Sequence, residues 1–169
     1  LGASNAALTS ALENSKTSEN ITIDSFLEFT SSQIGKTVSI NSLKSPDTSI
    51  LSLAESCAIG NALGIQLSIM LSNENNLEES FAGLNRDIYA KLSSKGIARG
   101  TIESVSNNID DFVASTDKAA DLLVSEVASH SAKGSVFGNT TLGIYNPPPN
   151  EFLSIINNAA QGAAEGSTN

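Results

Sequence analysis

The sequence has little of the chemistry from which most binding and catalytic sites are built. Its 169 residues include no Trp, one Cys, one His and one Met, and Lys and Arg together number 9. One Cys cannot close an internal disulfide, and one Cys with one His cannot supply the ligands of a zinc site. The scarcity of basic residues and a formal net charge of −9 argue against binding to nucleic acid or to an anionic membrane surface. We therefore expect no cofactor, no nucleic-acid partner and no membrane partner.

Long uninterrupted apolar runs are also lacking. The longest apolar stretch, Ala58 to Leu71, contains Asn61, Gln66 and Ser68, so we interpret it as a core segment and not as a membrane span. Because the chain starts at Leu1 and not at Met, we expect a mature chain or a fragment that carries no signal peptide.

Small neutral polar residues are abundant instead. The chain has 27 Ser, 17 Asn and 11 Thr, whereas charged residues make up only 16% of it, against about 25% in typical proteins. Its length and its 40% hydrophobic content fit one domain that buries its own core. We expect a surface solvated mainly by hydroxyls and amides.

Apolar residues recur with a helical period, which predicts an all-α fold: a single globular bundle of about five to six amphipathic helices with flexible termini. Linkers are expected at residues 1–3 and 162–169, with a helical repeat domain at 4–161 between them. Gly96 followed by Ile97 resembles a C-terminal glycine cap, and Thr101 resembles the N-cap of the next helix. The expected helices run from about Ser4 to Glu13, from Thr22 past Val38, from Ile50 past Leu63, from Asn75 or Asn76 to Gly96, from Thr101 to about Gly134 with a bend or division at Ser115-Thr116, and from Asn150 past Ile156, the residues from Ser135 to Asn150 being a loop.

Two short motifs suggest catalysis, and each has a simpler interpretation. Gly35-Lys36-Thr37 matches the end of a phosphate-binding loop, but Thr30 stands where that loop needs its first glycine, and no buried strand precedes it. Ser115 and Lys118 have the spacing of an acylating serine and its lysine, without the partner motifs of that chemistry. We interpret both as accidental.

The single histidine and the paired carboxylates are expected on solvated helix faces. For His130, a solvated histidine near a helix C-terminus is favoured over a general base, because no orienting group can be assigned to it. The pairs Glu78-Glu79, Asp110-Asp111 and Asp117 with Asp121 lie opposite apolar stripes, which favours a solvated face over a catalytic dyad. We predict that the protein is not an enzyme.

Three residues are candidates for covalent modification. Cys57 shares an apolar stripe with Ile50 and Ala54, so a buried structural thiol is expected, and the alternative is an intermolecular disulfide in an oxidising compartment. Asn20 and Asn139 begin N-glycosylation sequons in predicted loops, which supports secretion weakly in a chain so rich in Ser, Thr and Asn.

Several segments, spread over most of the chain, share one style of helical sequence. They are Ser80-Phe-Ala-Gly-Leu84, Ile88-Tyr-Ala-Lys-Leu92 followed by Gly96-Ile97, Thr101-Ile-Glu-Ser-Val105, Ile109-Asp-Asp-Phe-Val-Ala114, and Leu53-Ala54 with Ile59-Gly-Asn-Ala-Leu-Gly-Ile65. In this style the chain resembles the helical, non-crystalline repeats of spider silk proteins (spidroins) of the aciniform, minor ampullate and tubuliform kinds. It departs from these repeats in its lower Ala and Ser content, in its higher Lys and Asp/Glu content, in Cys57 and Met70, and in having no poly-Ala or Gly-rich blocks, so the type of silk stays open.

The resemblance implies a repeat unit that is secreted into a silk gland lumen and that self-associates with other repeats and chains of a fibre. A segment for partial α to β conversion is suggested by Ile65, Leu67, Ile69 and Leu71, which alternate with less apolar residues at the period of a strand, although a core helix explains the pattern equally well. The alternative function is a secreted helical-bundle carrier that binds a lipid or another apolar ligand in its core.

Overall fold

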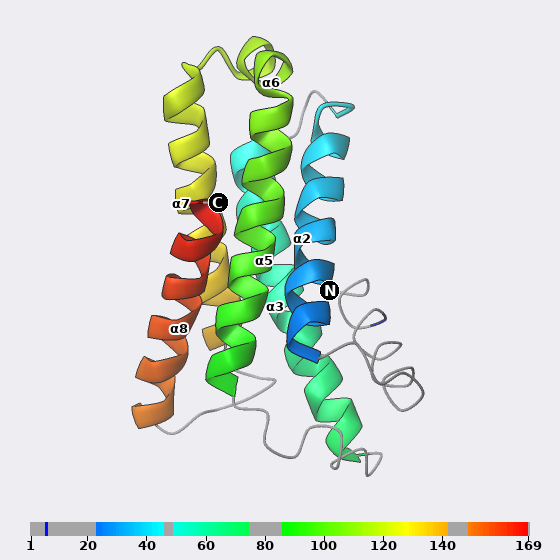
Figure 1. Ribbon diagram of the computed structural model, residues 1–169, viewed down its shortest axis with the longest axis vertical. Helices are drawn as coiled ribbons and strands as arrows, with labels where there is room; N and C mark the ends of the chain where they lie inside the picture. Colours follow the sequence, from blue (N-terminus) through cyan, green and yellow to red (C-terminus); the bar gives the residue numbers. More distant parts are fainter. Residues whose placement is uncertain (1–5, 7–22, 46–48, 75–85, 142–148, 169) are drawn as a thin grey trace.

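A computed structural model describes residue 6 and residues 23–45, 49–74, 86–141 and 149–168, and these residues form helices without any strand (Figure 1). The all-α bundle expected from the helical period is confirmed. The expected helix at Ser4 to Glu13 lies outside the described residues apart from Ala6, as does the expected helix start at Asn75 or Asn76. The helices are α2 (Ile23–Ser42), α3 (Ile50–Glu74), α5 (Arg86–Asn107), α6 (Ile109–Thr116), α7 (Ala120–Thr140) and α8 (Pro149–Ser167).

The five long helices pack in two layers. In one layer α5 lies between α2 and α8, and in the other α3 packs against α7 (Figure 1). The second layer fits into the grooves of the first, because α3 contacts α2 and α5, and α7 contacts α5 and α8. Successive long helices alternate between the two layers and reverse direction, so neighbours within one layer run parallel (Figure 1).

Apolar cores form where the layers meet, and small polar residues are buried between them. One cluster joins α3, α5, α6 and α7, and a smaller one joins α5 and α8 under Val136. Among the described residues the buried polar side chains are serines, apart from Asn61 and Thr101. The interior is therefore narrow and built largely from small side chains. The buried members of the two clusters are Ile50, Ala54, Val105, Phe112, Leu123 and Val127, and Ala90, Ile155 and Ala159.

Helix boundaries differ from the sequence prediction at two interior points. Gly96 does not end a helix and Thr101 does not begin one, because α5 runs through both, and Thr101 is buried. The chain turns instead at Asn108 and at Asp117, whose backbone is left-handed (φ 54°) and whose N–H donates to the Val113 carbonyl. The division expected at Ser115-Thr116 is confirmed, because α6 ends at Thr116. The break at Asn108, which separates α5 from α6, was not predicted.

The C-terminal part is also more helical than predicted. α7 continues to Thr140 through residues expected to be loop. α8 continues to Ser167, so the linker predicted at residues 162–169 is wrong over most of its length. Gly162 and Ala163 are buried there, which shows that these small residues pack against a neighbouring helix.

Candidate functional site

Glycines spaced four residues apart bring the parallel helices into backbone contact. A Cβ atom added to Gly96 or Gly100 of α5 would overlap the backbone carbonyl of Glu28 or Ser32 in α2, respectively. Gly162 and Gly166 of α8 meet the carbonyls of Lys91 and Lys95 in α5 in the same way. In both pairs of helices the contacts ascend together along the two chains, as parallel helices require. We call these two pairs, together with Gly134/Gly138 below, the glycine pairs.

The second layer repeats the arrangement. Gly134 of α7 meets the carbonyl of Glu55 in α3, and a Cβ on Gly138 would lie 2.9 Å from the Cα of Ile59 and from the Cβ of Ala62. At such an approach Cα–H groups contact carbonyl oxygens of the facing helix, a weak attraction that recurs at close helix interfaces. All three parallel contacts of the described bundle therefore depend on residues without a side chain.

Ion pairs accompany the glycine pairs at matching positions. Lys95, which precedes Gly96, lies 3.2 Å from the Glu28 carboxylate, and Lys133, which precedes Gly134, lies 2.8 Å from the Glu55 carboxylate. In each case the glutamate is the residue whose carbonyl meets the glycine. The same Lys-Gly and Glu arrangement thus fixes the register of α5 on α2 and of α7 on α3.

One further ion pair joins α5 and α8. Lys91 lies 2.8 Å from Glu165 at the contact of α8 with α5. That lysine, followed by a hydrogen bond from Gln161, holds the pKa of the Glu165 carboxyl below its usual value.

His130 belongs to this network and is not simply solvated as predicted. Its Nδ1 lies 2.8 Å from Oε2 of Glu55, and Lys133 contacts the other carboxylate oxygen. Hydrogen bonds from Lys133 and then from His130 lower the pKa of Glu55. The histidine therefore joins α7 to α3, a contact between residues 75 positions apart that the sequence pattern could not show.

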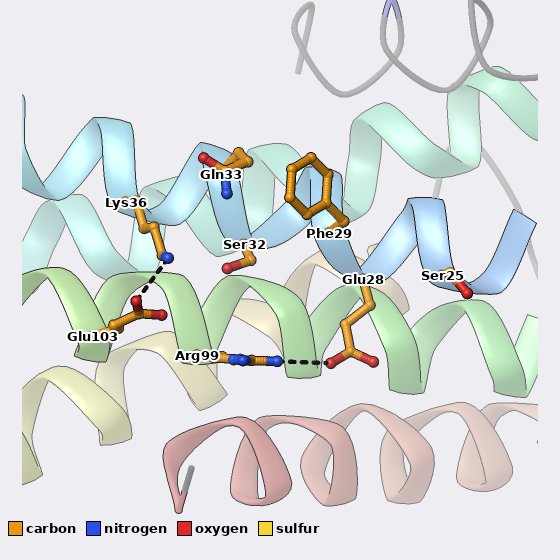
Figure 2. Close-up of a pocket in the computed structure, with 8 residues that line it drawn as sticks. All are labelled: Ser25, Glu28, Phe29, Ser32, Gln33, Lys36, Arg99 and Glu103. Atoms are coloured by element: carbon orange, nitrogen blue, oxygen red, sulfur yellow. Dashed lines mark hydrogen bonds and ion pairs between the residues drawn. The ribbon is translucent and has the colours of Figure 1, made fainter. Parts of the chain in front are cut away.

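A groove of about 390 Å³ runs between α2 and α5 on the outer side of the bundle (Figure 2). Lys36 reaches Glu103 across it at 2.8 Å, and Arg99 lies 3.7 Å from Glu28. Because each cation faces a carboxylate, the groove presents paired charges. Its lining residues are Ser25, Glu28, Phe29, Ser32, Gln33, Lys36, Arg99 and Glu103.

The catalytic motifs considered from the sequence are not assembled into sites. Gly35 faces the Ile97 carbonyl of α5 inside a helix, and no strand precedes it among the described residues. The Ser115 hydroxyl donates to the Phe112 carbonyl, while Lys118 pairs with Glu126 at 2.8 Å. Both motifs therefore have ordinary structural roles.

The paired carboxylates are spread over the surface. Asp110 and Asp111 are exposed in the first turn of α6, and Asp117 and Asp121 are exposed beside the turn into α7. Glu78-Glu79 lies outside the described residues. Within the described ranges no group of three His, Cys, Asp or Glu side chains could hold a metal ion.

Cys57 is half-buried in α3, and burial raises the pKa of its thiol to about 11. The sequon at Asn139 was predicted in a loop, but Asn139 lies in the last turn of α7, where its side chain donates to the Ser135 carbonyl. The sequon at Asn20 lies outside the described residues. The intermolecular disulfide at Cys57 and the N-glycosylation of Asn20 and Asn139 stay predictions.

The proposed conversion segment is helical. Ile65 is buried and Leu67 is half-buried in α3, and the side chains of Ile69 and Leu71 lie outside what the structure describes.

The window Ile50–Ser68 of α3 is apolar and long enough to cross a membrane by length and composition alone, and 39% of it is buried. Since core helices of soluble proteins pass the same test, this observation is weak evidence for a membrane span.

The glycine pairs were missed in the sequence, although their signal was present. Glycines four residues apart occur at 60/64, 96/100, 134/138 and 162/166. Of these glycines only Gly96 has a predicted role above, and that role is a C-terminal cap.

Comparison with known proteins gives no relative: no family model, no curated protein and no solved structure matches the chain.

Proposed function

We propose that this chain is a structural module, a repeat unit of a secreted silk-type fibre protein, with no catalytic centre. It stays soluble as a helical domain and associates with further copies on dehydration, acidification and shear. The observation that supports the proposal best is the use of glycine pairs at all three parallel helix contacts. The same contact geometry is repeated three times in one chain and holds the helices close together. The residues around the glycines are neutral or form ion pairs.

The composition of the interior supports the same role. Buried serines whose hydroxyls have protein partners, including Ser31, Ser42 and Ser93, occupy places where larger apolar side chains are usual in a core. Serine hydroxyls can exchange water for protein partners at modest cost, whereas unpaired buried charges cannot. A module made in this way tolerates the loss of water that fibre formation requires.

The charge distribution suggests how acidification promotes association. Carboxylates ordinarily lose their charge near pH 4, so acid reduces the net charge of −9 that keeps copies apart. Glu55 has a lowered pKa, so its contribution to stability is lost only when the pH falls through that lowered value. Repulsion between copies therefore weakens before the α3–α7 contact does.

A concentration, pH and shear series followed by circular dichroism and light scattering tests the proposal. We expect helical, dispersed protein at neutral pH and growing assemblies under acid and shear. Leu67→Lys tests the conversion segment: sheared wild-type material should gain β signal in infrared spectra, and the variant should gain less.

Two outcomes would contradict the proposal. One is a parent gene that encodes a single copy of this unit whose purified product contains a bound lipid, which would favour the carrier alternative. The other is protein that stays dispersed through the whole series. If infrared spectra of the sheared material show no gain of β signal, only the proposed α to β conversion is contradicted.

A further inference from the structure

A second cavity, of about 420 Å³, lies at one end of the bundle between α6, the end of α2 and the start of α3 (Figure 1). Its floor is apolar. Phe112 of α6 and Ile50 of α3 are 1% and 3% exposed, and the half-buried Leu43 and Leu51 pack against the same core cluster. Small-molecule sites are usually cavities of about 300–1,000 Å³ with mainly apolar linings and a few polar groups. We call this space the end cavity.

The rest of the lining is polar and includes one cation, Lys118. Among the lining residues that the structure describes none is a carboxylate, although the chain has 18 acidic and only 9 basic residues. Ile50 and Leu51 belong to the first turn of α3, which also carries no acidic residue, so the positive end of the helix dipole adds to the lysine charge. The end cavity therefore favours an anionic group over a cationic one.

Two of the lining hydroxyls are already committed as donors. Ser115 and Thr116 both donate to the Phe112 carbonyl, at 3.0 and 2.7 Å. Because a hydroxyl has a single hydrogen, these two can accept further hydrogen bonds but cannot donate them. Lys118 is therefore the group beside them that can donate to an anion.

Lys118 has donors to spare. Its ammonium group has three N–H donors, and it lies 2.8 Å from the carboxylate of Glu126 in α7, while its side chain is 33% exposed. An anionic headgroup can share Lys118 with Glu126. The two negative charges then repel each other, so Glu126 limits how tightly the headgroup is held.

The groove between α2 and α5 differs in this respect. Its cations face carboxylates that line the same groove, Lys36 with Glu103 and Arg99 with Glu28. Its large apolar side chain, Phe29, is 61% exposed. Of these two spaces, the end cavity is the one that combines a buried apolar floor with a cation in its wall.

We propose that the end cavity binds a single-chain amphiphile with an anionic headgroup, such as a medium-chain fatty acid. The hydrocarbon chain packs on Phe112, Ile50, Leu43 and Leu51, and the carboxylate lies at Lys118. The inference goes beyond the proposed function and does not depend on it, because a fibre repeat and a single-copy carrier can each hold an amphiphile at this place.

Titration calorimetry of the wild-type chain at pH 7 with decanoate, below the concentration at which it forms micelles, tests the proposal. Three further ligands separate the two parts of the amphiphile: acetate lacks the chain, decanol lacks the charge, and decyltrimethylammonium reverses the charge. We expect decanoate to bind most tightly, decanol more weakly, and the other two weakest. A net charge of −9 attracts the cation to any nonspecific site, so this order identifies a specific one.

A lysine variant tests the headgroup contact. Lys118→Gln should weaken the binding of decanoate by at least about tenfold and leave the binding of decanol unchanged. Lys44→Gln is the matched control, because Lys44 is exposed on α2 near the same end of the bundle and is not among the lining residues. Each variant removes one positive charge and changes the formal net charge from −9 to −10, and the control should bind decanoate as the wild type does.

Two more variants separate ligand recognition from effects on the fold. Glu126→Gln removes the competing carboxylate and should tighten the binding of decanoate by about two- to fivefold, the range of a partly exposed charge interaction. An ion pair that only supported the fold would give weaker binding when broken. Ser115→Phe places a ring at an exposed position of the lining and should abolish the binding of decanoate and of decanol. Circular dichroism checks that each variant keeps the helical fold.

Several results would overturn the inference. They are a wild type that does not bind decanoate, binding of decyltrimethylammonium at least as tight as that of decanoate, equal weakening by Lys118→Gln and Lys44→Gln, and weaker binding after Glu126→Gln. Equal affinities for decanoate and decanol would exclude recognition of an anionic headgroup. If a folded Ser115→Phe variant binds decanoate as the wild type does, the ligand lies elsewhere and the assignment to the end cavity is wrong.

Discussion

Substituting Gly100 by alanine separates helix propensity from helix packing. In a helix interior that accepts a methyl group, Gly→Ala stabilises by about 1 kcal/mol. At Gly100 the new Cβ would overlap the Ser32 carbonyl oxygen and lie 2.7 Å from the carbonyl carbon and 2.8 Å from the Cα of that residue. Carbon atoms in contact prefer about 3.5–4.0 Å, so α2 and α5 would have to separate by about 1 Å.

The expected result is a loss of stability, opposite in sign to the propensity effect. Overpacking of a tight site costs about 1–3 kcal/mol, and separating two long helices adds lost contacts along both. We expect the free energy of unfolding to fall by about 2 kcal/mol. At roughly 2–4 °C per kcal/mol for a domain of this size, the Tm should fall by about 4–8 °C.

Urea and thermal unfolding followed by circular dichroism measure the effect. Ser106→Ala, at an exposed position of the same helix, is the matched control and should change the free energy of unfolding by no more than about 0.5 kcal/mol. Gly162→Ala, where the Cβ would overlap the Lys91 carbonyl, should lose stability as Gly100→Ala does. A Gly100→Ala domain that is more stable than the wild type by about 1 kcal/mol would refute the packing argument.

Three other perturbations have defined outcomes. Glu55→Gln should lower the unfolding midpoint at pH 7, and the difference should shrink in acid as wild-type Glu55 is protonated; an equal loss at every pH would exclude an ionic contribution. Phe112→Ala removes a side chain that is 1% exposed, so unfolding experiments should show that the free energy of unfolding falls by about 3–5 kcal/mol. A fall of less than about 1 kcal/mol would mean that α6 is loosely packed around Phe112. The Cys57 thiol, with its pKa of about 11, should react with a disulfide reagent far more slowly in native than in urea-unfolded protein, and equal rates would contradict its burial.

The period of apolar residues was enough to predict the fold class and the approximate starts of α2, α3 and α8. Ile50 and Ala54 were assigned to one stripe of a helix, and both are buried in α3. Boundaries were less accurate, because a glycine near the end of an apolar stripe has two explanations. Gly96 has the sequence of a C-terminal cap, yet it lies inside α5, where its missing side chain admits α2.

The site depends on contacts that local pattern cannot encode. A glycine at a helix end and a glycine at a close contact both lack a Cβ atom, and only the facing helix distinguishes them. Spacing by four was visible at 96/100, 134/138 and 162/166, whereas the partner carbonyls are supplied by residues far away in the sequence. The contact of His130 with Glu55 also could not be predicted from local sequence, because the two side chains meet only when α7 packs against α3.

The parallel course of α2, α5 and α8 has a consequence for tension. A pull on the start of α2 at Ile23 and on the end of α8 at Ser167 acts along the helix axes and draws the two outer helices past α5 in opposite directions. The backbone contacts and the Lys95–Glu28 and Lys91–Glu165 pairs are then strained all at once, not peeled apart from one end. Because the chain alternates between the two layers, α2, α5 and α8 run parallel, and this shear arrangement raises the force that the folded domain withstands before it extends.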